Sequence, residues 1–193
     1  MKAREYAADV LLADGGLIHI RAIRPDDKRR LLEGFRRLSE RSVYYRFFSL
    51  KRDLSAAELA YLTEVDFVQH VALAATVRPA LPIHDLEFGF EEEPGASDRT
   101  GLEEIVGVAR YVRRGADRAE VAIAVADDHQ QRGVGSVLLQ HLVAIARAAG
   151  ITTIEAEVLA ENASLHQVFL ARNGFQPTFT PAGETVHLCF SIL

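Results

Sequence analysis

The sequence reads Val121-Ala-Ile-Ala-Val125, then Gln130-Gln131-Arg132-Gly133-Val134-Gly135, then an amphipathic run over 136–149. This order predicts a strand, a glycine-bearing loop and a helix start within a few residues of one another. Glycine lets the backbone approach a ligand closely, and the free N–H groups at a helix N-terminus point toward negative charge. We therefore expect an anion-binding loop here. A tight strand-to-helix turn without a ligand is the plain alternative.

Two nucleotide-binding motifs are similar to this loop but fail at particular positions. A Rossmann fingerprint needs a third glycine at position 138, which is Leu138, and Glu155 falls inside its predicted strand instead of at the strand's end. A P-loop needs Gly-Lys-Ser/Thr, which is absent from the loop. The seven histidines show no metal-ligand spacing, so we expect no metal site.

Length and composition are typical of one domain with a sizeable core, since 49% of the 193 residues are hydrophobic. No apolar run approaches the ~20 residues of a membrane span, so we expect no membrane partner. The first twelve residues contain acids and no long apolar core, which argues against a signal peptide. Cys189 is the single cysteine, which suits a reducing compartment. We therefore expect a cytoplasmic protein, either a monomer or a homodimer.

The net charge of −5 is unevenly distributed along the chain. Residues 79–104 hold eight acids and one arginine, so the remainder is close to neutral. No basic stripe of the kind that nucleic-acid binding requires is left, and we expect no nucleic-acid partner. The composition of 79–104 predicts a long, flexible acidic connection. Attraction of a basic protein substrate is the functional alternative for this segment.

The pattern along the chain predicts an α+β (mixed α/β) fold, with a mixed central sheet of about six to seven strands flanked by about four helices. Ser55 and Glu58 form a capping-box pattern, Gly150 ends the helix that follows the loop, and residues 42–48 are interpreted as aromatic and irregular. Strands are expected over 17–24, 68–77, 105–112, 118–125, 152–159, 175–179 and 185–192, and helices from Pro25, from Ser55, over 136–149 and over 162–172.

Several motifs together resemble the GNAT superfamily of N-acetyltransferases. The motif Gln130-x-x-Gly133-x-Gly135 after a valine-rich strand is similar to that family's acetyl-CoA loop, and Asn162 and Asn173-Gly174-Phe175 are similar to its later landmarks. Further segments resemble bacterial Pat-type protein-lysine acetyltransferases, namely Asp14-Gly15-Gly16, 20–27, 38–42, 46–49, 65–67 and 105–110. The resemblance implies a GNAT-like (acyl-CoA N-acyltransferase) fold and a single N-acetyltransferase domain over 1–193. It also implies acetyl transfer from acetyl-CoA to an amine, foremost the ε-amine of a protein lysine.

The resemblance assigns cofactor binding to three parts of the chain. The backbone of Ile123, Ala124 and Val125 matches the strand that pairs with the pantetheine arm, and this strand must diverge from its neighbour to leave backbone groups free. Asn162 matches a cofactor-contacting asparagine, with a helix N-cap as the structural alternative. The loop that would hold the pyrophosphate comprises Gln130, Gln131, Arg132, Gly133, Val134, Gly135 and Ser136.

The same resemblance makes Glu120 the catalytic base. A lysine amine has a pKa of about 10.4, so its proton must leave, directly or through water, before the amine attacks the thioester. Glu120 lies on the strand that leads to the loop, on the face opposite Val121. The structural alternative is a surface carboxylate paired with Arg118 or Arg110. We expect a strand N–H, at or near Val125, to hold the thioester oxygen.

One position departs from the family pattern. Many GNAT enzymes carry a tyrosine seven residues after the asparagine as an acid for the leaving thiolate, but here the position is Phe169. The stretch 162–174 is also one residue longer than the common pattern. His166, three residues before Phe169, would have to act through water, and we assign it no role. A thiolate is a fair leaving group near neutral pH, so an enzyme is still predicted. The alternatives are a small-molecule amine N-acetyltransferase and a non-catalytic CoA-binding sensor or partner module.

The acceptor side is the least specified by the sequence. The aromatic residues Tyr44, Tyr45, Phe47 and Phe48 fall where GNAT enzymes form their acceptor groove. Packing under the first helices is the alternative role for these side chains. The acceptor itself is therefore expected to be an amine, with a basic protein as the favoured class.

Overall fold

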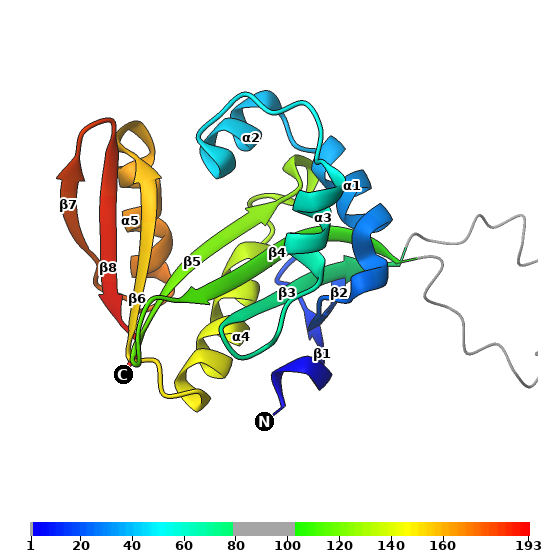
Figure 1. Cartoon of the computed structure of the whole chain (residues 1–193), viewed down its shortest axis with the longest axis horizontal. Coiled ribbons are helices and arrows are strands. Elements are labelled where there is room, and N and C mark those ends of the chain that lie inside the picture. Colours follow the sequence, from blue (N-terminus) through cyan, green and yellow to red (C-terminus); the bar gives the residue numbers. More distant parts are fainter. Residues whose placement is uncertain (1, 79–102) are drawn as a thin grey trace, which may run out of the picture.

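The computed structural model describes residues 2–78 and 103–193, which form a mixed sheet with helices on both faces (Figure 1). Within these ranges eight strands pair in the order β1-β2-β3-β4-β5-β6-β8-β7. β5 and β6 run parallel, and the other neighbouring strands run antiparallel. The strands are β1 (Ala7–Leu11), β2 (Leu17–Ala22), β3 (His70–Val77), β4 (Glu104–Arg113), β5 (Arg118–Val125), β6 (Thr153–Leu159), β7 (Thr178–Ala182) and β8 (Thr185–Ser191).

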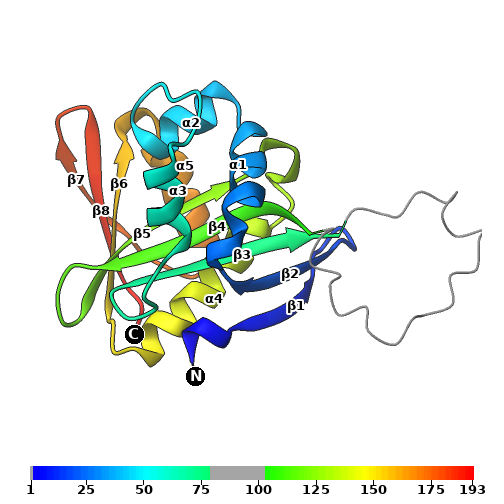
Figure 2. The same ribbon diagram turned by 45° about the vertical axis from the view of Figure 1, so that its right-hand side comes forward.

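Five α-helices of the described residues divide between the two faces of the sheet (Figures 1 and 2). The three N-terminal helices lie on one face, and the two C-terminal helices lie on the other. This division follows the chain, because α4 connects the parallel strands β5 and β6, and α5 connects β6 to β7. The helices are α1 (Lys28–Arg36), α2 (Glu40–Phe47), α3 (Ala56–Thr63), α4 (Val134–Ala148) and α5 (Ala163–Arg172).

Each face of the sheet has its own hydrophobic core. Phe35 of α1 and Ala74 of β3 belong to one cluster of buried side chains, and Leu142 of α4 belongs to the other. α1 approaches β4 closely at Gly34, where an added Cβ would lie 2.8 Å from the carbonyl oxygen of Ile105. A larger residue at this position would push α1 away from the sheet. The close approach places α1 directly over the strand that precedes β5.

The expected α+β class is confirmed, and several local predictions agree with the structure. β5 has the predicted bounds 118–125. The Ser55 side chain accepts a hydrogen bond from the N–H of Glu58, whose carboxylate accepts from the N–H of Ser55, so the capping box is present. Gly150 follows α4 with a φ of +79°, a left-handed conformation that favours glycine at a helix end.

Two elements were missed, so the expected counts of six to seven strands and about four helices are too low. β1 lies at the sheet edge and pairs only with β2, and its short pattern is only half-buried. α2 occupies most of the stretch interpreted as irregular, and that interpretation is wrong. Ser39 caps this helix by accepting a hydrogen bond from the N–H of Ser42 at 3.2 Å. The sequence does contain a helix N-cap signal at Ser39, but the aromatic composition of 42–48 favoured the irregular interpretation.

The acidic connection predicted over 79–104 lies outside the described residues except for its last two positions. Glu103 is buried, and Glu104 begins β4, so these two acids belong to the folded domain and the predicted boundary is too late. The reason is the ion pair of Glu103 with the buried side chain of Arg21, at 3.1 Å between Nε and Oε2. In the described ranges, no helix has the length and apolar character needed to cross a bilayer.

Candidate active site

β5 and β6 begin as neighbours and then diverge. Their parallel register covers three pairs, from Arg118 with Thr153 to Glu120 with Glu155. Beyond this point β5 pairs with β4 alone and β6 pairs with β8 alone, and Figure 1 shows the two strands separating. Within the described residues, one backbone edge of 121–125 therefore has no strand partner. The divergence expected around Ile123, Ala124 and Val125 is present.

The loop after β5 is held open by two left-handed residues. Gln131 has a φ of +60° and Gly133 a φ of +94°, and α4 starts at Val134. The Gln130 side chain ties the loop down, because its Nε2 donates to the carbonyl oxygen of Val125 at 3.1 Å and to the carboxylate of Asp127 at 2.6 Å. The role of glycine at 133 is conformational, since a side chain is strained at this φ.

The N–H groups of this loop form a cradle. In the part of the chain that the structure describes, no acceptor is found for the N–H groups of 131–136, and the first helical bond runs from Val137 N to Gly133 O at 3.0 Å. At Gly135 an added Cβ would make only ordinary contacts, at 3.7 Å from Phe169 and Val125. Packing within the chain therefore does not demand glycine there. Six N–H groups at the start of a helix, with glycine at 133 and 135, can bind a phosphate group.

Arg132 lies beside this cradle but is already ion-paired. Its Nε donates to Oδ2 of Asp14 in the β1–β2 turn at 2.6 Å, and both side chains are partly exposed. This hydrogen bond from Arg132, together with one from the N–H of Gly16, holds the pKa of Asp14 below its usual value. The turn between β1 and β2 thereby positions the guanidinium next to the loop.

Glu120 stands at the last paired position before β5 and β6 diverge. Its side chain is half-exposed, and Oε2 accepts hydrogen bonds from Nε of Arg114, at 2.9 Å, and from Nη2 of the same residue. The expected alternative partners are wrong. Arg118 instead donates to Glu155 at 2.7 Å, and Arg110 donates to the carbonyl oxygen of Leu62. An exposed ion pair is weak, roughly 0.2–1 kcal/mol, so Glu120 is free to exchange Arg114 for a substrate group.

Of the two site residues predicted in the α5 region, Phe169 lies beside the loop, whereas the Asn162 side chain contacts His166. The ring of Phe169 lies beside Gly135 and Val125, where the loop meets α4. Asn162 occupies the N-cap position without a capping hydrogen bond, and its amide lies 3.2 Å from Nε2 of His166. The N-cap alternative for its side chain is therefore wrong. Burial lowers the pKa of His166, so the ring is neutral at neutral pH and is a poor acid.

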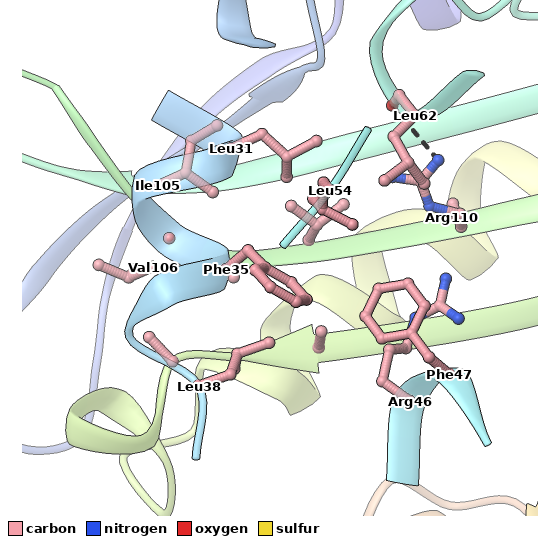
Figure 3. Close-up of a pocket in the computed structure, with 15 residues that line it drawn as sticks. Leu31, Phe35, Leu38, Arg46, Phe47, Leu54, Leu62, Ile105, Val106 and Arg110 are labelled. Atoms are coloured by element: carbon pink, nitrogen blue, oxygen red, sulfur yellow. Dashed lines mark hydrogen bonds between the residues drawn. The ribbon is translucent and has the colours of Figure 1, made fainter. Parts of the chain in front are cut away.

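Two arginines of the site were not identified from the sequence. Arg46 of α2 and Arg110 of β4 line a pocket of about 60 Å³ between α1–α3 and the strands β4 and β5 (Figure 3). Phe47 lines the same pocket and packs against Phe35 with ring centroids 5.7 Å apart, which agrees with the packing role expected for the aromatic residues. The sequence does contain one signal for Arg110, because this charged residue interrupts the apolar strand 105–112.

Comparison with known proteins assigns the family. Residues 74–175 match the model of the acetyltransferase (GNAT) family. The chain is 32% identical over 161 residues to acetyltransferase Pat of Mycolicibacterium smegmatis, covering 82% of this chain but only 41% of that protein. The GNAT domain of S. lividans PAT superimposes with a TM-score of 0.78 and 36% identity, over 96% of each chain.

A more distant structure shares the fold. It is a putative acetyltransferase from Salmonella typhimurium, solved with its cofactor acetyl-CoA, with a TM-score of 0.58 and 18% identity. It covers 90% of this chain and 91% of that one. The family model spans more than half of the sequence, and the divergent strands and the loop have the arrangement that the resemblance implied. The chain therefore belongs to the acetyltransferase (GNAT) family.

Proposed function

We propose that the protein is an acetyl-CoA-dependent N-acetyltransferase that acetylates the ε-amine of a protein lysine by direct attack on the thioester. One observation carries this proposal. A single strand, β5, has a free backbone edge, an N–H cradle after its C-terminal end and a carboxylate at the point of divergence. Family membership supports it, as does the similarity to acetyltransferase Pat and to the GNAT domain of PAT.

The residues that would hold acetyl-CoA lie along this strand and its loop. The N–H groups of 131–136 fit the pyrophosphate, with Gln130 fixing the loop and Arg132 beside it. The free edge at Ile123, Ala124 and Val125 offers backbone groups to the pantetheine arm. Asn162 and Phe169 of the α5 region are the remaining contacts expected, and Phe169 already borders the loop.

The reaction needs one proton acceptor from the chain. The amine attacks the carbonyl carbon of the thioester, the C–S bond breaks, and CoA leaves as a thiolate. Glu120 lies five residues before Val125, roughly 17 Å along an extended strand, so it takes the amine's proton through water molecules. A strand N–H near Val125 holds the carbonyl oxygen as it gains charge. The exposed ion pair of Glu120 with Arg114 is weak enough to open when the amine approaches.

The test is a substitution of Glu120 by glutamine. Turnover with acetyl-CoA and a lysine peptide, followed as CoA thiol release and peptide mass, should fall by roughly 10²-fold or more, with acetyl-CoA affinity unchanged by calorimetry. Glu155→Gln is the matched control, because Glu155 stands opposite Glu120 in the register and is paired with Arg118. Unchanged turnover in Glu120→Gln would remove Glu120 from the mechanism.

A second candidate is acetylation of a small-molecule amine. The observation that favours it is the small volume of the pocket over β5, about 60 Å³. A non-catalytic CoA-binding module is the third candidate, because Phe169 has no proton to give. Turnover on peptides, turnover on small amines, or CoA binding without thiol release distinguishes the three. One domain over 1–193, a cytoplasmic monomer or homodimer, and the absence of metal, nucleic-acid and membrane partners complete the proposal.

A further inference from the structure

Two arginines that line the pocket over β5 form no ion pair within the described residues. Figure 3 shows Arg46 and Arg110 in the same part of the pocket, beside Phe47, with the guanidinium of Arg110 directed toward the carbonyl oxygen of Leu62. Among the described residues, neither arginine has a carboxylate within ion-pairing distance. Burying a cation is costly unless it is paired. The arrangement therefore needs an explanation that packing alone does not supply.

Arg110 is almost fully buried and only partly hydrogen-bonded. It is 5% exposed, its Nη1 donates to the carbonyl oxygen of Leu62 at 3.3 Å, and the same atom lies 3.1 Å from Nε2 of His70. Burial, followed by the charge of Arg110, lowers the pKa of His70 to about 4, so His70 is a neutral acceptor. Nε and Nη2 of Arg110 have no partner among the described residues.

Arg46 is partly buried and has even fewer partners. Its guanidinium stacks on the Phe47 ring at 5.0 Å from the centroid, and the described residues provide it with no hydrogen-bond acceptor. Burial lowers the pKa of Arg46, while the nearby charge of Glu120 acts in the opposite direction. No buried side-chain N or O atom of the described residues is sealed away without a partner. The free N–H groups of both arginines therefore reach open space in the pocket.

The pocket lies where an acceptor must approach the thioester. Ala124 of β5 is part of its lining, and Arg110 pairs in register with Ala122. Glu120 is therefore the diagonal neighbour of Arg110 on the same face of the sheet, roughly 7–8 Å away between Cα atoms. The proposed base and the proposed thioester-binding residues thus lie on β5, Arg110 lies on the neighbouring strand β4, and Arg46 of α2 lines the same pocket. An acceptor that presents its amine here presents its adjacent groups to Arg46 and Arg110.

We infer that Arg46 and Arg110 bind a carboxylate carried by the acceptor amine, and that the pocket selects acceptors of this class. The inference rests on the proposed N-acetyltransferase function and deepens it. Two guanidinium groups offer the planar donors that match a carboxylate. The pocket volume, about 60 Å³, exceeds the roughly 10–15 Å³ that a cavity needs to hold one water molecule, which leaves room for such a group.

The carboxylate has two chemical sources, and matched acceptors distinguish them. The first pair is a lysine peptide flanked by glutamate and the same peptide flanked by glutamine. The second pair is free lysine and lysinamide. In each pair the amine is the same and only the negative charge changes. Initial rates of CoA thiol release give kcat and KM for all four acceptors.

The wild-type protein should favour the carboxylate member of at least one pair by about 10- to 100-fold in kcat/KM, mostly through a lower KM, because hydrogen bonds to charged groups are strong. A preference in the first pair identifies an acidic residue beside a protein lysine as the source. A preference in the second pair identifies the carboxylate of a free amino acid. Equal rates within both pairs would overturn the inference and leave the acetyltransferase proposal standing.

Variants tie the preference to the two arginines. In Arg46→Met with Arg110→Met the ratio within the favoured pair should fall to about 1, while kcat for the uncharged member changes little. Arg46→Lys, which keeps the charge, should retain part of the preference. Arg36→Met is the matched control, since Arg36 belongs to the same helical layer, is exposed and pairs with Asp53. Thermal unfolding verifies the fold, and Arg46→Met alone provides the test if the buried Arg110→Met does not fold.

The outcomes separate the two proposals. A preference that survives both substitutions would show that another group recognises the carboxylate and would overturn the inference. An absence of acetyl transfer to all four acceptors, with acetyl-CoA bound, would overturn the proposed function and the inference with it. Loss of the preference in the arginine variants alone, with transfer to lysinamide retained, supports both.

Discussion

Two sets of arginines on the same face of the sheet differ in whether carboxylates of the described residues pair with them. Arg21 of β2 is 2% exposed and donates to both carboxylate oxygens of Asp27, at 2.7 and 2.8 Å. Its Nε donates to Glu103 at 3.1 Å. Arg46 and Arg110 lie on the same face, yet the described residues offer them no carboxylate. The register from Arg21 through Ala74 to β4 places Arg21 and Arg110 under the layer α1–α3, to which Arg46 belongs.

The difference separates a structural role from a binding role. Arg21 and its two acids join β2, the turn before α1 and the start of β4, and every strong donor is used within the chain. Asp27 also accepts a hydrogen bond from the N–H of Arg24, at 2.8 Å, which fixes the entry to α1. A guanidinium group that is fully paired has no free N–H donor for a ligand. The guanidinium groups of Arg46 and Arg110 keep free N–H donors beside an open pocket.

The largest effect should come from breaking the Arg21 set. In Asp27→Asn the Arg21 guanidinium loses the charge that balances it, and removal of one partner from a buried pair costs about 3–5 kcal/mol. Urea unfolding measures the change. Asp53→Asn is the control, because Asp53 pairs with Arg36 on the surface and should alter stability by less than ~0.5 kcal/mol. If Asp27→Asn lowers the free energy of unfolding by less than about 1 kcal/mol, the structural role assigned to the Arg21 set is wrong.

The same set predicts the direction of acid sensitivity. Burial alone would raise the pKa of Asp27, but the hydrogen bonds and charge of Arg21 outweigh it and hold the pKa below its usual value. A depressed carboxylate pKa contributes stability that is present above the unfolded value, about 3.9, and is lost as the pH falls through the folded value. Unfolding free energy should therefore decline below about pH 4 in the wild type. In Asp27→Asn this part of the pH dependence should be absent.

A smaller effect is expected from removing the other arginines. Arg46→Met with Arg110→Met removes two positive charges that repel one another in the pocket. Burial, together with the charge of Arg46, lowers the pKa of Arg110 to about 9. The free energy of unfolding should change by less than about 1 kcal/mol, or should rise, because methionine fills a similar apolar space. A loss as large as that of Asp27→Asn would mean that these arginines hold the fold together.

The smallest effect concerns Arg132, whose partner Asp14 is on the surface. Asp14→Asn should leave stability within ~0.5 kcal/mol of the wild type and raise acetyl-CoA affinity by less than about threefold, because an exposed pair is weak. Calorimetric titration measures the affinity. A tenfold loss of affinity would instead show that Asp14 is needed to orient Arg132 toward the loop.

What could be predicted from the sequence was local, and what could not was distant in the chain. β5, the glycine loop and α4 are contiguous, so their order and the loop's N–H cradle follow from the sequence. The pocket joins Arg46 of α2 to Arg110 of β4, which only the packed fold brings together. The partner of Glu120 was missed for a similar reason, since the bend of the β4–β5 turn returns Arg114 to β5. β1 and α2 were missed because one is a short edge strand and the other a short aromatic helix.

Amide hydrogen exchange tests the central claim most directly, because the claim is that the N–H groups of 131–136 and the free edge of β5 receive acetyl-CoA. These N–H groups have no acceptor among the described residues, so they should exchange quickly in the free protein. With saturating acetyl-CoA, exchange should slow over 131–136 and over 123–125, while the edge strand β1 should not change. Exchange over 131–136 that is equally fast with and without bound acetyl-CoA would contradict the account.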